Sequence, residues 1–212
     1  AALVADLQSR AEDAAVPVRH WITVGRTALC DACDYDQIVE QASGKPVPLA
    51  AGDDEPLFIM YTSGTTGHPK RTVQTHISIE WSLLTVVAST DMRYRDRYLI
   101  SMPLYHIAAF NNMGTTLYRG GTIVILQQFD AEETWHTLRD ERINITLAVP
   151  AMLTQMLAKY DAQRHQPLAL RWILTGAQAM PLELIYQLGQ LGFNVYQAYG
   201  LTEAGGVGCC IT

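Results

Sequence analysis

The sequence predicts an α/β protein with a mostly parallel β-sheet and flanking helices. Two observations carry this prediction. Short apolar runs that are partly β-branched alternate along the chain with segments of helical periodicity. Hydrophobic residues make up 49% of the sequence, which is enough for a core and excludes a disordered polar chain. Because the apolar runs are continuous, we expect strands that are covered on both faces.

The predicted strands follow one another from residue 57 onward. They are residues 57–61, 98–102, 122–126, 145–149, 172–175 and 194–196. A further short strand is expected at residues 21–24, after a helix that ends near Ala15.

The segments between the later runs carry helix signals. Asp130 is a predicted N-cap with Glu133 at capping-box spacing, and Trp135 and Leu138 follow on one face. Pro181 suits the first turn of another helix. The apolar faces of two further helices are formed by Leu153, Met156, Leu157 and Tyr160, and by Leu184, Leu188 and Leu191.

Length and charge restrict the possible functions. A chain of 212 residues corresponds to one domain or two small ones. Residues 1–60 carry 10 acidic and 4 basic side chains and residues 61–212 carry 11 of each, which gives the net charge of -6. We therefore expect no basic surface for nucleic acid. The acidic first part would also repel phosphate backbones and anionic membranes.

The remaining composition favours a cytoplasmic protein. No run of about 18 apolar residues is present, so no membrane span is expected, and the first residues lack the pattern of a signal peptide. Four cysteines are too few for a disulfide scaffold, and a reducing compartment is the default. Residues 42–56 are the predicted linker because they contain three prolines, two glycines and three consecutive acids.

The cysteines occur in two pairs. Cys30 and Cys33 have the spacing of zinc or redox pairs, but no second Cys/His pair follows at zinc-site spacing. The neighbouring acids disfavour a reactive thiolate, so neither role is expected. Cys209 and Cys210 are expected to be small buried hydrophobes.

Residues 57–70, LFIMYTSGTTGHPK, are the most informative segment. A predicted strand leads directly into a loop of glycines, hydroxyl side chains and a lysine. Glycines allow backbone N–H groups to approach a phosphate chain closely, hydroxyls add donors, and a lysine neutralises charge. The candidate phosphate-binding residues are Thr62, Ser63, Gly64, Thr65, Thr66, Gly67 and Lys70.

This loop is not a Walker loop. The fifth position after Gly64 is Pro69, where a Walker loop requires glycine. Pro69 followed by Lys70 also disfavours the helix that should begin there, so an ordinary P-loop nucleotidase is not expected.

Three segments resemble the signatures of the adenylate-forming superfamily, which includes acyl-CoA ligases, luciferases and the adenylation domains of peptide synthetases. YTSGTTGHPK, residues 61–70, resembles the phosphate-binding signature. PLYH, residues 103–106, resembles the aromatic–His motif beside the acyl pocket, and YQAYGLTEAGG, residues 196–206, resembles the Tyr-Gly-x-Thr-Glu motif. The chain is most similar to bacterial long-chain fatty-acyl-CoA ligases, over roughly residues 55–212.

The resemblance implies parts of two mostly parallel β-sheet subdomains with flanking helices, as in the large domain of acyl-CoA ligases. Residues 1–88 would be the end of the first subdomain, with the phosphate-binding loop at residues 61–70. Residues 95–212 would be most of the second, with the acyl pocket and the adenine and magnesium side. The small C-terminal domain of the family is expected to be absent.

The resemblance also implies a reaction. The family joins a carboxylic acid to ATP to form an acyl-adenylate, and then forms a thioester with coenzyme A. Mg²⁺ is the expected metal ion, held by Glu203 with Thr62 as a second contact, since oxygen ligands suit this ion. The implied catalytic residues are Lys70, Thr202 and Glu203, because charge neutralisation should dominate when two anions meet.

The resemblance assigns the remaining roles by position. Nucleotide binding would involve the loop residues together with Gly176, Ala177, Gln178, Tyr199, Gly200 and Thr202. His106 and Gly205 would line the acyl or thiol route. His76 is expected to start a helix, whereas His136 and His165 have no evident partners in the sequence.

Three departures from the family pattern stand out. Arg71 replaces the glycine that usually follows the loop lysine, and residues 176–179, Gly-Ala-Gln-Ala, replace Gly-Gly-Ala-Pro. The chain also ends nine residues after Glu203, before the family's ribose-binding aspartate and its catalytic lysine. We therefore expect a fragment with little activity of its own, and self-association through exposed sheet edges.

Two alternatives remain open. One is an aryl-CoA ligase or an amino-acid-adenylating domain, since the phosphate motifs do not separate these from a fatty-acid enzyme. The other is a non-catalytic nucleotide-binding module.

Overall fold

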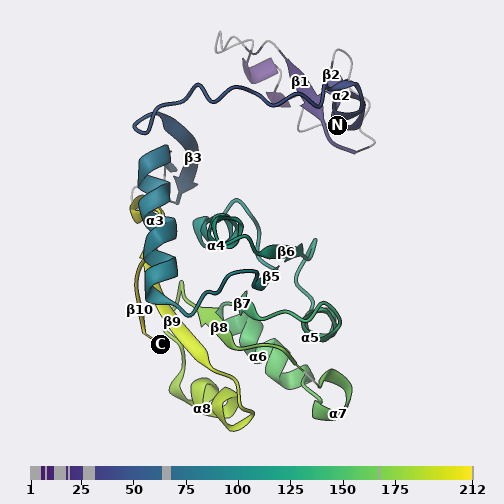
Figure 1. Cartoon of the computed structure of the whole chain (residues 1–212), viewed down its shortest axis with the longest axis vertical. Helices are drawn as coiled ribbons and strands as arrows, with labels where there is room; N and C mark the ends of the chain where they lie inside the picture. Colours follow the sequence, from purple (N-terminus) through teal and green to yellow (C-terminus); the bar gives the residue numbers. More distant parts are fainter. Residues whose placement is uncertain are drawn as a thin grey trace. The chain divides into compact units, whose positions relative to one another are not determined.

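The computed structural model describes residues 6–7, 9–11, 18, 20–25, 32–63, 68–166 and 168–211. The chain divides into two compact units, Ala1–Ala50 and Ala51–Thr212. The division falls within the predicted linker at residues 42–56. Each unit is considered by itself (Figure 1).

The first unit contains a small parallel strand pair. Strand β1 (Trp21–Thr23) pairs with β2 (Ala32–Asp34), and helix α2 (Tyr35–Gln41) follows directly. Asp34 begins this helix as its N-cap, because its side chain accepts a hydrogen bond of 3.1 Å from the backbone N–H of Gln37. Cys33 is exposed, while Cys30 and the expected end of a helix near Ala15 lie outside the described residues.

The second unit is built on a six-stranded sheet of order β10-β9-β8-β7-β5-β6. The strands β5, β6, β7, β8 and β9 run parallel to their neighbours, and only β10 is antiparallel, against β9. The predicted α/β class with a mostly parallel sheet is therefore confirmed. The strands are β5 (Arg97–Ile100), β6 (Thr122–Ile125), β7 (Ile145–Leu147), β8 (Trp172–Thr175), β9 (Val195–Leu201) and β10 (Gly206–Ile211).

Helices connect these strands and cover both faces of the sheet. Because successive side chains of a strand point to opposite faces, Leu99 and Ile173 belong to one buried cluster, whereas Tyr98 and Trp172 belong to another. The first cluster is completed by side chains of α5, α6 and α8, and the second by side chains of α4. These helices are α4 (Ile107–Tyr118), α5 (Ala131–Asp140), α6 (Pro150–Lys159), α7 (Ala162–His165) and α8 (Leu182–Gln190).

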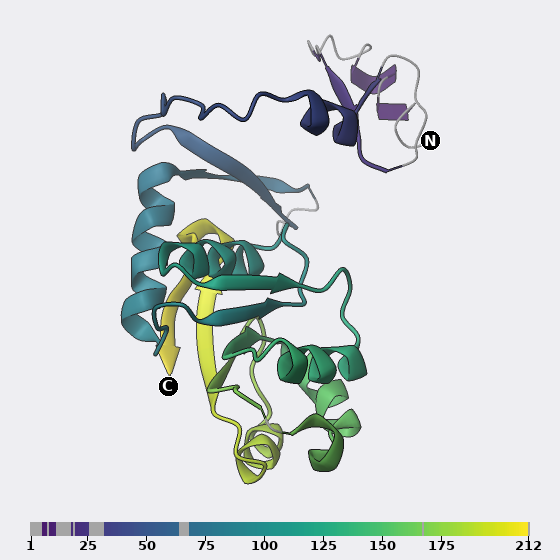
Figure 2. The same ribbon diagram turned by 45° about the vertical axis from the view of Figure 1, so that its right-hand side comes forward.

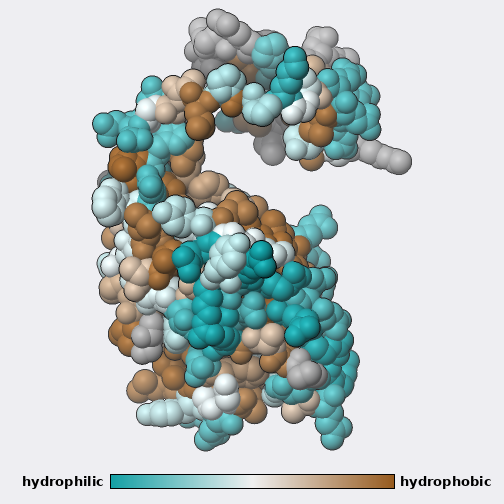
Figure 3. Space-filling view, viewed as in Figure 1, coloured by the Kyte–Doolittle hydropathy of each residue, from teal (hydrophilic) through white to brown (hydrophobic). Residues whose placement is uncertain are grey.

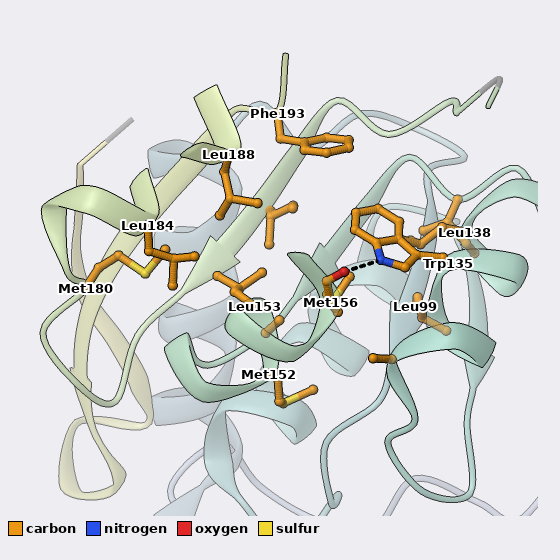
Figure 4. Close-up of a cluster of buried hydrophobic side chains, with 14 residues drawn as sticks. Leu99, Trp135, Leu138, Met152, Leu153, Met156, Met180, Leu184, Leu188 and Phe193 are labelled. Carbon is orange, nitrogen blue, oxygen red and sulfur yellow. Dashed lines mark hydrogen bonds between the residues drawn. The ribbon is translucent and has the colours of Figure 1, made fainter. Parts of the chain in front are cut away.

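Trp135 belongs to the first cluster and lies near Leu138 and Met156 (Figure 4). Its ring is fully buried, and its indole N–H donates a hydrogen bond of 2.7 Å to the carbonyl of Met156. The large apolar ring is thus buried without leaving its polar group unpaired. The predicted cap of α5 is also present, since Asp130 accepts from the backbone N–H of Glu133 at 2.9 Å.

The segment around the glycine-rich loop forms a separate antiparallel hairpin of β3 (Pro56–Thr62) and β4 (Lys70–Thr75). The expectation that the strand at residues 57–61 would be covered on both faces is wrong, because Ile59 is 53% exposed and Tyr61 is 66% exposed. A two-stranded ribbon covers only one face. On that face, Phe58 meets Phe110 of α4 edge to face, with ring centroids 4.7 Å apart.

Helix α3 (His76–Ser89) joins the hairpin to the sheet. It begins at His76, as predicted, and Thr75 and Ser78 cap it reciprocally. The helix contacts both α4 and β10, and Figure 2 shows it running beside the last strand. The predicted subdomain boundary at residues 88–95 covers the last two residues of α3 and most of the connection to β5. Helix α3 packs against the hairpin and the sheet, which belong to one compact unit. The assignment of residues 1–88 and 95–212 to two subdomains remains a prediction.

The surface of the second unit retains apolar side chains. Figure 3 shows hydrophobic residues reaching the surface along α3 and beside α4, where Trp81 and Leu117 are exposed. Cys209 is exposed and Cys210 is half-buried, so the expectation that both are buried is wrong. The antiparallel β10 lies at the sheet edge, which leaves these residues without cover on one side. Self-association through exposed edges remains a prediction.

Among the described residues, no helix combines the length and the apolar character needed to cross a membrane.

The short helix α7 is held by a buried histidine, contrary to the expectation that His165 lacks partners. The backbone N–H of Asp161 donates to Nδ1 of His165 at 3.0 Å, and the ring stacks on Trp135 with centroids 5.9 Å apart. Burial lowers the pKa of His165 below its usual value, and the nearby carboxylate of Glu132 only partly offsets this effect.

We predict that unfolding of the second unit depends on the protonation of His165. The folded pKa is lower than the unfolded value of about 6.5, so the unfolded state binds more protons and stability is lost as the pH falls below about 6.5. Urea unfolding at pH 7.5 and pH 5.5 would measure this loss. It should shrink in His165→Phe and persist in His136→Gln, which removes a half-exposed imidazole of the same cluster. An equal pH dependence in wild type and His165→Phe would contradict the prediction.

Candidate functional site

A cavity of about 840 Å³ lies where the parallel strands end. Residues 101–103 follow β5, residues 126–129 follow β6, and residues 174–177 end and follow β8, and all three segments line the cavity. The carboxyl ends of parallel strands meet at one edge of a sheet, which is the usual place for ligands in such folds. The cavity is therefore the candidate functional site.

The walls of the cavity are largely apolar. No Asp, Glu, Lys or Arg occurs among the described residues that line it. Its polar contributions come from side chains such as His106, Gln127, Gln128 and Thr175, together with backbone groups. A neutral apolar group would be desolvated there at little cost, whereas a charged group would lose its hydration without gaining an opposite charge.

The PLYH segment contributes one wall. Pro103, Tyr105 and His106 line the cavity, and His106 precedes α4 as its N-cap residue without using its side chain to cap the helix. The His106 ring lies against Tyr105, with centroids 4.6 Å apart. An imidazole that is not used in capping remains available to a ligand in the cavity.

The segment after β8 contributes a strained wall. Gly176 lies so close to β9 that a Cβ there would be 2.9 Å from the carbonyl oxygen of Ala198, so only glycine fits. Ala177 has φ 66°, a left-handed conformation that is unfavourable for residues with a Cβ. Both residues line the cavity, whereas Gln178 and Ala179 are exposed and do not.

The turn after β9 contributes the polar rim. A short 3₁₀ helix, η1 (Thr202–Ala204), joins β9 to β10. Gly200 and Thr202 line the cavity, while Glu203 is exposed and Tyr199, 65% exposed, does not line it. Gly205, which was expected to line the acyl or thiol route, is buried and does not line the cavity. The next two residues, Gly206 and Val207, line it instead.

The glycine-rich loop lies at the end of the hairpin. Thr62 and Lys70 are paired across β3 and β4 where the two strands meet the glycine-rich segment. Ser63 and Lys70 are exposed, while Gly64, Thr65, Thr66 and Gly67 lie outside the described residues. The side-chain amide of Gln74, on β4, donates to the carbonyl of Thr202 at 2.7 Å. The structure thus ties the hairpin to the turn that carries Thr202 and Glu203.

The charged side chains expected to bind phosphate or metal form no ion pairs among the described residues. Within the described part of the chain, no ion pair involves Lys70, Arg71 or Glu203. Lys70 is therefore a cation available to phosphate, and Glu203 is an oxygen ligand available to a hard metal ion.

A second group of possible metal ligands, Glu132, His136 and His165, lies away from the cavity. Nδ1 of His165 accepts a backbone hydrogen bond, so a neutral ring must carry its proton on Nε2, the atom that faces Glu132 at 3.9 Å. Arg164 already pairs with Glu132 at 2.6 Å. The arrangement favours an ion-pair and hydrogen-bond cluster over a metal site.

Several cavity residues were not identified from the sequence, among them Phe129, Met152 and Ala198. Phe129 lies in the loop after β6, so extending the predicted strands to their carboxyl ends would have indicated this segment. Met152 belongs to a helical face that equally suits a core, and no local signal distinguishes the two.

The chain is similar in sequence to a known protein family and to curated enzymes. Residues 2–212 match the sequence model of a family described as AMP-binding enzyme. The long-chain-fatty-acid–CoA ligase FadD13 of Mycobacterium tuberculosis is 38% identical over 173 residues, which are 82% of this chain and 34% of the relative. The indoleacetate–CoA ligase of Aromatoleum aromaticum is 36% identical over 80% of this chain and 34% of its own length. The chain thus spans about a third of the curated relatives that it matches.

Solved structures agree with the sequence comparison. The inhibitor-bound N-terminal domain of FACL13 from Mycobacterium tuberculosis matches with a TM-score of 0.76 and 37% identity, over 84% of this chain and 46% of that one. The o-succinylbenzoate coenzyme A synthetase of Bacillus subtilis, in complex with ATP and magnesium ion, matches with a TM-score of 0.78 and 25% identity, over 96% of this chain and 43% of that one.

We predict that Ala177→Gly stabilises the protein, because glycine adopts the observed φ of 66° without the clash of a Cβ. The gain should be up to about 1 kcal/mol in the free energy of unfolding, measured with urea. Ala179→Gly is the matched control, since Ala179 is exposed and has no positive φ. It should lose a few tenths of a kcal/mol through the greater freedom of the unfolded chain. Equal effects of the two substitutions would refute the prediction.

Proposed function

The chain belongs to the AMP-binding enzyme family, and from this membership we propose that it supplies the nucleotide and acyl sites of an ATP-dependent acyl-CoA ligase. The reaction would join a carboxylic acid to ATP with release of pyrophosphate, and the acyl-adenylate would then form a thioester with coenzyme A. The observation that carries the proposal is an uncharged cavity bordered by the turn with Thr202 and Glu203. The hairpin with Lys70 is hydrogen-bonded to that turn.

The charged groups would act on the phosphates. We propose that Lys70 and the loop from Thr62 hold the β- and γ-phosphates, and that the Thr202 hydroxyl donates to the α-phosphate. Glu203 would hold Mg²⁺, with Thr62 as a second contact. The approach of a carboxylate to ATP brings two anions together, so groups of this kind stabilise the developing charge.

The nucleotide base would lie across the end of the sheet. Gly176, Ala177 and Gly200 offer backbone surface at the cavity wall, and the exposed ring of Tyr199 offers a face on which adenine could stack. Gln178 is the remaining residue proposed for this contact.

The cavity supports an alkyl or aryl acid as substrate. Its lining lacks a carboxylate that could pair with the ammonium of an amino acid, among the described residues. Relatives named as ligases of long-chain fatty acids and of indoleacetate are compatible with this chemistry. We propose a fatty acid as the substrate, with His106 beside the acyl or thiol route and Gly205 supporting the turn behind it. An aryl acid is the second candidate, because the same apolar walls would accept an aromatic ring.

These assignments concern the full-length protein. The expectation that the 212-residue chain alone has little activity remains a prediction, as does its cytoplasmic location.

The function is tested by following pyrophosphate exchange into ATP by the full-length protein with a panel of acids. Fatty or aryl acids should support exchange, and coenzyme A should then yield the thioester, detected by mass spectrometry. Amino acids should be at least about 100-fold poorer substrates, because an unpaired ammonium would be buried. Efficient exchange with an amino acid would overturn the proposed substrate class. Nucleotide binding without exchange for any acid would point to a non-catalytic module.

We predict that Glu203→Gln lowers exchange by about 100-fold or more and raises the Mg²⁺ concentration needed for half-maximal rate, since a neutral amide is a poorer ligand for a hard cation. Titration of Mg²⁺ at saturating ATP measures both effects. Glu183→Gln is the control, because Glu183 is exposed on α8 and bonds only Gln187 among the described residues. A Mg²⁺ dependence unchanged from wild type in Glu203→Gln would exclude the proposed role.

A further inference from the structure

A buried polar cluster lies behind the turn that joins β9 to β10. It consists of Gln74 on β4, Ser82 on α3 and Asn111 on α4, which are 3%, 6% and 0% exposed. None of the three lines the cavity. The cluster therefore lies outside the set of residues assigned to substrate or nucleotide.

The cluster binds the backbone of the turn at two points. The Asn111 amide donates to the Gly205 carbonyl at 2.7 Å, and the Ser82 hydroxyl donates to the same carbonyl at 2.9 Å. At the other end, the Gln74 amide donates to the Thr202 carbonyl at 2.7 Å. In the sequence, Glu203 lies between Thr202 and Gly205, the two residues whose carbonyls are bonded.

The donors are themselves held in orientation. The Asn111 amide nitrogen also donates to the Ser82 hydroxyl oxygen at 2.7 Å, so the two donors to the Gly205 carbonyl are bonded to each other. The Ser78 hydroxyl lies 3.0 Å from Oε1 of Gln74 and 2.9 Å from the Thr75 carbonyl, so its single proton serves one of these two acceptors at a time. Asn111 and Ser82 thus hold the Gly205 carbonyl as a bonded pair, and the Gln74 amide holds the Thr202 carbonyl.

Close packing leaves the turn little freedom. Gly205 has φ 74°, and a Cβ on it would lie 3.4 Å from the Cβ of Ser82. Gly206 has φ 125°, and a Cβ on it would lie 3.0 Å from Nδ2 of Asn111. A displacement of the turn would leave buried donors unpaired, which is unfavourable in a dry environment.

We propose that Asn111 and Ser82, together with Gln74, are positioning residues that fix the Thr202–Gly206 turn and so place the Glu203 carboxylate for its cation. The inference rests on the proposed function for the identity of that cation, but not for the anchoring of the turn. The three residues would act on the reaction through Glu203, without contacting the substrate themselves.

The experiment compares Asn111→Ala with Asn112→Ala in the full-length protein. Asn112 is the neighbouring asparagine and is equally buried, but among the described residues its amide donates only to the Ala108 carbonyl of its own helix. Asn111→Ala should accelerate amide hydrogen exchange at residues 202–206 and raise the Mg²⁺ concentration for half-maximal pyrophosphate exchange about tenfold. The KM for the acid should stay unchanged, and Asn112→Ala should produce neither effect on the turn. Ser82→Ala keeps the Asn111 bond to Gly205 and loses the Asn111 bond to Ser82, so it should give a smaller change. It is a milder variant if Asn111→Ala does not fold.

A double-mutant cycle separates positioning from general destabilisation. In the Glu203→Gln background, Asn111→Ala should change the rate less than about twofold, because the group that it positions has already lost its charge. Full additivity, or hydrogen exchange at residues 202–206 unchanged by both Asn111→Ala and Ser82→Ala, would overturn the inference. A wild-type protein without pyrophosphate exchange would instead contradict the proposed function, and the hydrogen-exchange comparison would still decide the anchoring.

Discussion

The parallel backbone ladder of β5, β7, β8 and β9 is the constraint on which the site depends. Hydrogen bonding in parallel register brings the carboxyl ends of these strands to one edge of the sheet. The segments that follow them are far apart in sequence, yet they meet around one cavity. The motifs at residues 103–106, 176–179 and 199–206 converge for this reason, and not because of direct attraction between their side chains.

A second layer of contacts joins the hairpin to this edge. Phe58 packs on Phe110, and Gln74 bonds the Thr202 carbonyl, so the cation of Lys70 and the carboxylate of Glu203 are carried by elements in direct contact. The nonpolar contact fixes the hairpin on α4, whereas the hydrogen bond fixes its register against the turn. The turn that carries Glu203 borders a cavity whose described lining has no charged side chain, and the hairpin that carries Lys70 is hydrogen-bonded to that turn.

Sequence patterns predicted the parts whose causes are local. The cap at Asp130, the helix start at His76 and the apolar strands of the sheet follow from spacing and composition, and the structure contains them. Strands β4 and β10 were missed because Lys70–Thr75 is mostly polar and Gly206–Ile211 contains two glycines, so their pairing partners decide their conformation. The burial of Gly205 behind the turn, and the contribution of Phe129 and Met152 to the cavity, arise from packing between distant segments, for which a single sequence carries no local signal.

The cavity walls and the turn respond differently to sequence change. Each wall comes from a separate loop, and residues 126–129 after β6 make no hydrogen bond to the turn within the described structure. The strand that leads into the turn, in contrast, admits no side chain at Gly200, where a Cβ would overlap the Gly206 carbonyl. Side chains of the cavity walls can therefore change one loop at a time, whereas a change in the turn disturbs the buried hydrogen bonds that hold it. The cavity walls and the turn beside them are thus subject to separate structural constraints, although both lie at one edge of the same sheet.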